Sequence, residues 1–457
     1  MKSVRSCLLG CCVVAAVATP ALAVEFGVSL GYTITDSTNL SNSSLEESQR
    51  AVNPIPIVPG IEHTVSASLN GQERAADLDY DLSLYLAKTQ YEDNVLDDQV
   101  EARGSVQLEY RIRPGSVQWV FADYHFVAAD DLVSLSRDDD RAQTNALITG
   151  PRLSYRINSV DSANADAFLL NFWRENADDE RLFLARADLT RRLNARQSLG
   201  LLYTRTQLLG GESDETYSIN NLFLRLGNQL PRQGRVETDL GVSYNINEAA
   251  DGEETSRSAL FFQLRANQRF TRTWRGEFLA GRSYTDSALS SLSDILAGEQ
   301  DALSVASGVF LEDRARASIS RRGPVWGVSS GLSWNQTTFD NPADDRKTVT
   351  ASFDLNYAVT GRLGFFTGAS FQELKFSPEG FDRTDTSERF EAGLSWQHTA
   401  GFRSQIGWRT SEIDSAGADG LGLFEEEATW YSLTWAPRTR LNLINRAGGQ
   451  RRLQPLI

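Results

Sequence analysis

The sequence predicts an all-β fold, a transmembrane antiparallel up-and-down β-barrel of about twenty strands with both termini on the periplasmic side. Three observations predict this fold. Apolar and polar residues alternate along successive stretches of the chain, the connections between these stretches alternate between short and long, and no helical period continues beyond about two turns. A count of about eighteen strands is the alternative.

The clearest strand pair lies in the stretch Val100–Phe126. Its first half, up to Ile112, alternates apolar and polar residues one by one, so one face of the strand is apolar and the other is charged. Arg113-Pro114-Gly115 then predicts a tight turn, because proline presets one turn dihedral and glycine permits the other. A second extended run, Ser116–Phe126, completes a long amphipathic hairpin.

The same alternation recurs along the whole chain. Other strands are expected at residues 26–34, 61–69, 78–86, 146–157, 165–173, 182–192, 198–208, 236–244, 260–269, 349–357, 390–396 and 428–436. Tight turns are expected near residues 71–74, 158–163, 193–196, 229–233, 271–273, 321–324, 360–362 and 399–401, and longer loops at residues 37–60, 91–98, 127–144, 286–301, 378–386 and 414–427. Sorting of connections by length is typical of outer-membrane barrels, which have short periplasmic turns and long external loops. A soluble β-sandwich, the alternative, would have shorter strands and unsorted connections.

Such strands can cross a membrane although the mature chain lacks a long apolar segment. A spanning helix needs about 18 consecutive apolar residues, whereas a barrel strand needs about 9–11 residues of which every second one is apolar. In hydrocarbon every backbone polar group must be paired internally, so a spanning sheet has to close on itself. Aromatic residues near the ends of the expected strands, such as Tyr244, Tyr357, Trp396 and Trp435, fit girdles at the two membrane interfaces.

Three segments are expected along the chain. Residues 1–23 have a basic start, a short apolar core and an Ala21-Leu22-Ala23 ending, which predicts a signal peptide, export and a place in the cell outer membrane. Lipidation at Cys11 is the alternative for this leader. Residues 24–436 form the predicted barrel. Residues 437–457 carry five arginines and no acid, and we expect a basic tail that meets a periplasmic partner; the alternative is that the strands near the end are assigned wrongly.

Charge and cysteine content exclude several classes of protein. The formal net charge is −15, and removing Lys2 and Arg5 with the leader makes it −17, so a nucleic-acid binder is not expected. All three cysteines lie in the leader, so the exported chain has no disulfide. We expect outer-membrane lipid and lipopolysaccharide as surroundings, and no cofactor or bound metal.

The charged face of the alternating strands is the predicted lumen. Strands that carry acids and strands that carry arginines are separate, and such an arrangement selects solutes by charge. We predict that a polysaccharide or a small hydrophilic solute passes here; the alternative is that these charges only pair with one another and keep the wall wet. The predicted pore-lining residues are Asp77, Asp79, Asp81, Arg103, Glu109, Arg111, Arg152, Arg156, Glu237, Asp239, Arg265 and Arg269.

Catalysis is not expected. A barrel hydrolase needs a nucleophile with a positioned base, which is usually histidine, and only His63, His125 and His398 occur. His125 shares a strand phase with Asp123, but no partner nucleophile is evident. An outer-membrane hydrolase is therefore kept only as an alternative.

One group of residues carries a more specific resemblance. Trp119 and Asp123 on one expected strand are followed by Asn145 and then by Gly150-Pro151-Arg152 on the next. This pattern resembles the outer-membrane barrel proteins associated with PEP-CTERM/exosortase systems. Tyr32, Asp36, Asn39 and Leu40 are similar to the first strand of that family. The resemblance implies an outer-membrane location and a link to exopolysaccharide production and protein sorting, without an assigned activity.

The leading hypothesis is a porin-like barrel whose hydrophilic channel serves exopolysaccharide export or solute passage. The alternative is a structural or surface-display scaffold without transport. The second half of the hairpin, residues 116–126, carries bulky residues in both phases. We therefore expect a feature inside the pore at this strand.

Overall fold

The structure, a computed structural model, describes residues 25–40, 57–75, 77–92, 98–129, 142–175, 179–210, 216–248, 254–286, 289–290, 301–303, 308–377, 383–417 and 422–437. The predicted signal peptide, most of the predicted basic tail and the middle of several long loops lie outside these residues.

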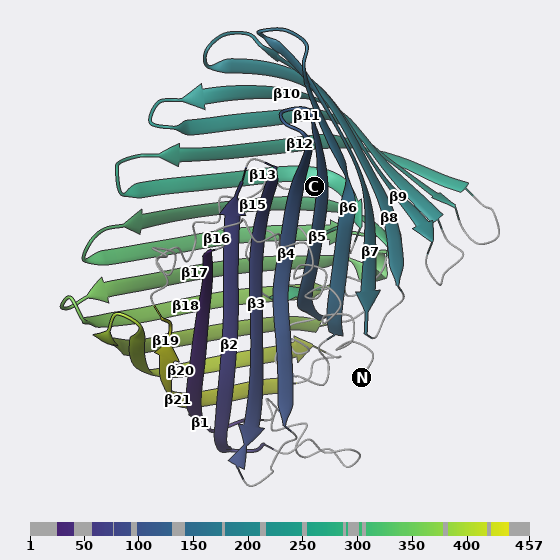
Figure 1. The fold of residues 1–457 in the computed structure, drawn as a ribbon. Coiled ribbons are helices and arrows are strands. Elements are labelled where there is room, and N and C mark those ends of the chain that lie inside the picture. The colour runs from purple at the N-terminus through teal and green to yellow at the C-terminus, as the bar shows by residue number, and fades with distance from the viewer. Residues whose placement is uncertain are drawn as a thin grey trace.

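The described chain forms one sheet of 21 strands, of which all except the three-residue β14 build a closed antiparallel barrel (Figure 1). Each long strand pairs with the next, and β21 pairs back to β1, so the predicted closed up-and-down barrel of 20 strands is confirmed. The strands are β1 (Glu25–Ser37), β2 (Gly60–Arg74), β3 (Leu78–Tyr91), β4 (Gln99–Arg113), β5 (Val117–Ala129), β6 (Ala142–Arg156), β7 (Asp161–Arg174), β8 (Glu180–Arg192), β9 (Gln197–Gly210), β10 (Thr216–Leu230), β11 (Gly234–Glu248), β12 (Glu254–Arg269), β13 (Trp274–Asp286), β14 (Asp301–Leu303), β15 (Val309–Arg322), β16 (Trp326–Thr338), β17 (Arg346–Ala358), β18 (Leu363–Phe376), β19 (Arg383–Thr399), β20 (Phe402–Gly417) and β21 (Gly422–Trp435). A 3-10 helix, η3 (Pro342–Asp344), follows β16.

The connections sort by length, as the sequence predicts. Short turns join β2 to β3, β4 to β5 and every second pair after that, and we call this end of the barrel the turn end. The start of β1 and the end of β21 also lie there. The opposite end, with the longer connections, is the loop end. The β4–β5 turn is closed by a 3.0 Å hydrogen bond from the Ser116 N–H to the Arg113 carbonyl, and Gly115 has the positive φ (+75°) that glycine permits.

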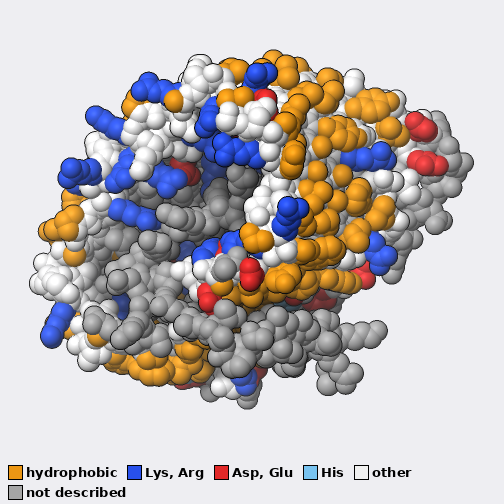
Figure 2. All heavy atoms as spheres, turned by 45° about the horizontal axis from the view of Figure 1, so that its top comes forward, with side chains coloured by type: hydrophobic (Ala, Val, Ile, Leu, Met, Phe, Trp, Pro, Cys, Tyr) orange, Lys and Arg blue, Asp and Glu red, His pale blue; other side chains and the backbone are white. Residues whose placement is uncertain are grey.

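The two faces of the wall follow from the strand register. Directly paired residues point to the same side of a sheet, so one phase can be traced from β1 to β21. That phase carries most of the exposed large apolar side chains and is the outer face, where they would meet lipid. Figure 2 shows such side chains covering a broad part of the surface. No helix in the described part of the chain is long and apolar enough to cross a membrane.

Aromatic residues mark the turn end of the outer face. Trp274 and Trp326 stand edge to face with their ring centroids 6.3 Å apart, and the Arg321 guanidinium lies 3.3 Å from the Trp326 centroid. Tyr357 pairs directly with Trp326, and Trp435 ends β21. Indole and phenol rings prefer the boundary between hydrocarbon and water, so this row has the character of an interfacial girdle.

The inner face of β5–β9 is apolar toward the loop end, which differs from the charged inner face that the sequence analysis emphasises. Phe168, Phe172 and Leu182 are each at most 1% exposed, and Leu289, from the connection after β13, is buried with them. We call this group the loop-end cluster; it comprises Val120, Ala122, Tyr124, Phe126, Ala146, Ile148, Phe168, Leu170, Phe172, Leu182, Leu184, Leu208 and Leu289. β14, from the same connection, pairs in parallel with the end of β5. The β13–β15 connection is thus held on the β5–β9 side of the barrel at two described places.

Candidate functional site

The inner face of the barrel is the candidate functional site. The register places every predicted pore-lining residue on the inward phase except Asp77, which precedes β3 and accepts a 2.7 Å hydrogen bond at its carbonyl from the Arg111 N–H. The inward residues are Asp79, Asp81, Arg103, Glu109, Arg111, Arg152, Arg156, Glu237, Asp239, Arg265 and Arg269. Most of them lie toward the turn end.

Many of these charges pair with one another. Arg111 binds Asp79 across β3 and β4, and Arg152 lies 3.2 Å from Glu109 and 3.4 Å from Asp166. Such pairs agree with the alternative given above, in which the lumen charges only pair with one another. Some inward arginines, however, have no acidic partner. Arg156 and Arg269 hydrogen-bond only to turn carbonyls among the described residues, so neither guanidinium is neutralised by an acid.

Basic side chains gather around the opening of the barrel. Figure 2, in which the top of Figure 1 comes forward, shows a hollow with Lys and Arg side chains dense around one side of it. By the strand register, the inward arginines near the turn end include Arg111, Arg152, Arg156, Arg192, Arg235, Arg269, Arg275, Arg322 and Arg403. An opening lined with arginine raises the local concentration of anions, and it does so in a chain with a formal net charge of −15.

The family-like motif divides between the two faces. Trp119, Asp123 and Asn145 lie on the outer phase, as does His125, and the Trp119 indole N–H donates a 3.0 Å hydrogen bond to the Thr149 hydroxyl. The inward side chains of β5 belong to the loop-end cluster. The feature inside the pore at this strand is therefore apolar packing, in the opposite phase from the motif.

Gly150-Pro151 shapes the wall itself. Pro151 has no N–H to donate, and the ladder between β6 and β7 omits residues 150 and 151. A Cβ at Gly150 would overlap the carbonyl oxygen of Ala167 and approach Phe168 Cα at 2.9 Å. A side chain at position 150 therefore has no room beside β7, and Pro151 interrupts the ladder next to it, so both residues have a structural role.

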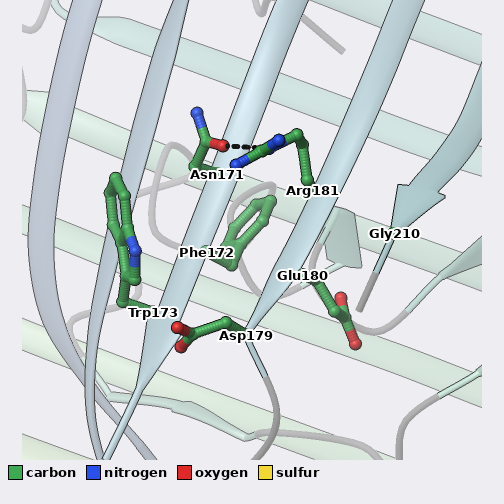
Figure 3. Close-up of a pocket in the computed structure, with 7 residues that line it drawn as sticks. All are labelled: Asn171, Phe172, Trp173, Asp179, Glu180, Arg181 and Gly210. Carbon is green, nitrogen blue, oxygen red and sulfur yellow. Dashed lines mark hydrogen bonds between the residues drawn. The ribbon is translucent and has the colours of Figure 1, made fainter. Parts of the chain in front are cut away.

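A cavity of about 300 Å³ lies at the loop ends of β7, β8 and β9, and Figure 3 shows the residues that line it. Asn171 and Arg181 line it, and the Arg181 Nε–H donates a 3.0 Å hydrogen bond to Asn171 Oδ1. Both of these residues belong to the outer phase, whereas Phe172 and Glu180 belong to the inner one. The cavity therefore sits on the rim of the barrel and is not part of the lumen wall.

A second cavity, of about 320 Å³, lies against the inner wall of β17–β21. It is lined by Asp354, Asn356, Phe366, Thr367, Gly368, Glu391, Arg403, Gln405 and Trp430. Aromatic, charged and amide side chains therefore meet at one place on an otherwise polar wall. The sequence analysis does not single out any of these residues, because each strand alone shows ordinary alternation and only the register between strands brings them together.

In the described residues no group of histidine, aspartate and glutamate side chains is arranged to hold a metal ion. Residues 130–141 of the expected loop, the predicted signal peptide and residues 438–457 lie outside the described residues. His63 is on the outer phase, bonded through its two ring nitrogens to the Tyr32 hydroxyl (2.8 Å) and to Glu92 (2.9 Å).

The fold and its two faces define the protein as a transmembrane-type antiparallel β-barrel with a largely polar inner wall. No protein-family model matches the chain, and no curated protein matches it. Solved structures with a similar arrangement include the siderophore receptor PirA from Pseudomonas aeruginosa, at 11% identity over 91% of this chain and 80% of that chain, with a TM-score of 0.44. The FrpB iron transporter from Neisseria meningitidis (F5-1 variant) shows 11% identity over 91% and 83%, with a TM-score of 0.46, and the ferric citrate transporter FecA shows 9% identity over 92% and 80%, with a TM-score of 0.44. These similarities are too distant to carry information about a ligand.

Proposed function

We propose that this protein is an outer-membrane barrel that provides a hydrophilic channel, with a preference for anionic solutes. The apolar outer face and the aromatic row at the turn end suit a bilayer. A barrel of 16–18 strands already leaves an aqueous channel, and a larger barrel leaves a wider one unless it is plugged.

The observation that carries the proposal is the polar inner wall from β15 through β21 to β4. Inward positions there are mainly serine, threonine, glycine and charged residues, such as Ser318, Ser333, Thr350 and Ser387. Apolar residues would dewet a pore, whereas hydroxyl and charged groups keep water and solutes in contact with the wall.

The direct test is conductance. The purified full-length barrel, added to planar lipid bilayers, is expected to produce stepwise current increments, with a reversal potential under a salt gradient that indicates anion preference. A barrel that inserts but carries no current would contradict the channel.

A second candidate is a scaffold without transport, and the loop-end cluster favours it. Leu289 and β14 both lie on the β5–β9 side, so part of the loop end is occupied by the chain itself. If the protein is a scaffold, the barrel carries no current in bilayers, and it still carries none after residues 291–300 are removed. If the channel is right, that deletion preserves or increases the conductance.

The link to exopolysaccharide is the more specific proposal, and it is supported by the motif resemblance alone. Deleting the gene is expected to reduce the polysaccharide released by the cell and to leave protein secretion otherwise normal. Unchanged release would contradict this link and would not affect the channel proposal.

The same deletion strain tests the hydrolase alternative. A gene copy that carries His125→Ala is expected to restore polysaccharide release as well as the wild-type gene does. The periplasmic partner is tested by a pull-down with the full-length barrel and with a barrel that lacks the tail, residues 437–457; a partner captured only by the full-length protein is expected.

A further inference from the structure

We propose that Phe366 and Trp430 form a platform on the inner wall that binds one pyranose ring of an oligosaccharide. This subsite deepens the channel proposal, on which it rests, by naming the class of solute that touches the wall.

The platform arises from one register row across four strands. Phe366 on β18 pairs directly with Gly393 on β19, Gly393 with Gly407 on β20, and Gly407 with Trp430 on β21. The order along the row is therefore aromatic, glycine, glycine, aromatic, and all four residues point inward. Strands lie about 4.8 Å apart, so two rings at the ends of this row would be far apart if they stood upright.

The glycines allow the rings to lie down. A Cβ on Gly407 would be 2.7–2.9 Å from three atoms of the Trp430 indole, and a Cβ on Gly393 would overlap Phe366 Cζ. Both rings thus occupy the space that side chains at 393 and 407 would take. Their centroids are 5.8 Å apart with 30° between the ring planes. Both side chains are half-buried, so part of each ring stays accessible from the lumen.

Polar groups surround this aromatic surface. Arg403, Gln405 and Asn356 line the same cavity, and within the described part of the chain none of their side chains has a hydrogen-bond or ion-pair partner. Asp354 accepts a 3.1 Å hydrogen bond from the Ser329 hydroxyl, and Glu391 lies 3.5 Å from Arg389, so each carboxylate keeps lone pairs for a further donor.

This chemistry fits a sugar better than other solutes. The C–H groups on one face of a pyranose carry partial positive charge and stack on the negative face of an aromatic ring. Hydroxyl groups both donate and accept hydrogen bonds, so they need a site that offers both, which the guanidinium, amides and carboxylates supply. An inorganic anion would gain nothing from two aromatic faces and would meet the carboxylates of Asp354 and Glu391. A simple metal cation could use those carboxylates but would leave the N–H donors of Arg403 unused.

The test is calorimetric titration of the full-length barrel in detergent with linear gluco-oligosaccharides and uronate oligosaccharides of one to six units. Trp430→Ala is expected to raise the Kd by about tenfold. Gly407→Ala keeps every aromatic residue but forces the indole off the wall, and it should also weaken binding by severalfold. The matched control is Trp408→Ala, which removes an indole from the outer face, where it lies 5.9 Å from Phe390 in a comparable pair. Its Kd should stay within twofold of the wild type.

Three results would overturn the subsite: no binding of either sugar series by the wild type, unchanged binding by both Trp430→Ala and Gly407→Ala, or an equal loss with Trp408→Ala. Bilayer recordings separate the two proposals. Stepwise currents without sugar binding would support the channel and contradict the subsite. Sugar binding by a barrel that carries no current would support the subsite and contradict the channel.

Discussion

Arg225 and Asp239 lie directly opposite each other on β10 and β11 and share two parallel hydrogen bonds, Nε–H to Oδ1 and Nη2–H to Oδ2, each 2.7 Å long. The Asp239 side chain is only 2% exposed. Bidentate pairing of this kind fixes both side chains and is among the strongest polar contacts in proteins. The pair lies in the turn-end half of the inner wall. Arg265 lies nearby on β12, the strand next to β11.

Asp239→Asn is expected to destabilise the barrel by about 3–5 kcal/mol, because it leaves the mostly buried Arg225 guanidinium without its carboxylate. Urea unfolding of the barrel in lipid vesicles, followed by tryptophan fluorescence, measures the change. Glu277→Gln is the control. It breaks the exposed pair with Arg275 (62% and 46% exposed), which should cost about 0–1 kcal/mol. Equal losses in both variants would contradict the special role of Asp239.

Removing two unpaired arginines near the turn end should weaken anion preference. Arg156→Gln combined with Arg269→Gln is expected to lower the anion-to-cation permeability ratio by up to about fivefold, since one charge at short range in a wet pore is worth about 1 kcal/mol. The measurement is the reversal potential under a salt gradient. The effect should fade above about 1 M salt, where the Debye length is about 3 Å.

The matched control for this pair removes the same number of charges from the outer face. Arg191→Gln combined with Arg282→Gln changes residues that pair with Asp161 (3.7 Å) and Asp313 (3.6 Å) outside the lumen. The reversal potential should not move. A shift as large as that of the inner pair would show that total charge, and not lumen charge, sets the preference.

Gly150→Ala should destabilise the barrel by about 1–3 kcal/mol, because the new methyl group would overlap the Ala167 carbonyl and force β6 away from β7. The urea midpoint in vesicles reports the loss. At Gly210, where a Cβ would meet nothing within 4 Å, the same substitution should change stability by less than about 0.5 kcal/mol. A tolerated Gly150→Ala would mean that the strands can separate freely at the motif.

Phe168→Ala is expected to cost about 3–5 kcal/mol, since Phe168 is 1% exposed within the loop-end cluster and its loss leaves a cavity. Its neighbour Leu169 points outward and is 43% exposed, so Leu169→Ala serves as the control. Lipid chains can fill the space that the outer side chain leaves, and the loss there should be clearly smaller. Similar losses would indicate that the cluster is loosely packed.

Single-strand patterns account for much of this architecture. Alternation predicts many of the long strands and the sorting of connections predicts the turns, because both signals are local. The strands β10, β13, β15, β16, β18 and β20 are not among the expected stretches, and only the count of about twenty implies them. The inward phase of Asp79, Arg111 or Asp239 also follows from alternation alone. Strand lengths do not follow in the same way: the long strands run to 13–17 residues, beyond the expected stretches, because pairing continues outside the region that lipid must cover.

Features that depend on several strands at once could not be derived in this way. Phe366 and Trp430 are 64 positions apart, and only the register of β18 to β21 places their rings over two glycines. The loop-end cluster also depends on such neighbours. Val120 and Phe168 lie on the inner phase of β5 and β7, two strands that carry large apolar residues in both phases, so alternation does not show which face of these strands points inward. The signal that could have indicated the platform is an inward glycine on one strand paired with an inward aromatic residue on the neighbouring strand.

The pairing of β1 with β21 has a consequence for the order of events during assembly. The Ser37 hydroxyl donates a 2.8 Å hydrogen bond to Glu426 Oε1, across 389 positions of sequence. Hairpins can form early from neighbouring residues, but this seam needs both ends of the chain at the same place, and long-range contacts of this kind slow folding. Until the final strand arrives, β1 presents an open row of backbone donors and acceptors that hydrocarbon cannot satisfy. Insertion into lipid therefore has to wait for the last strand, or to proceed beside a partner that covers the first.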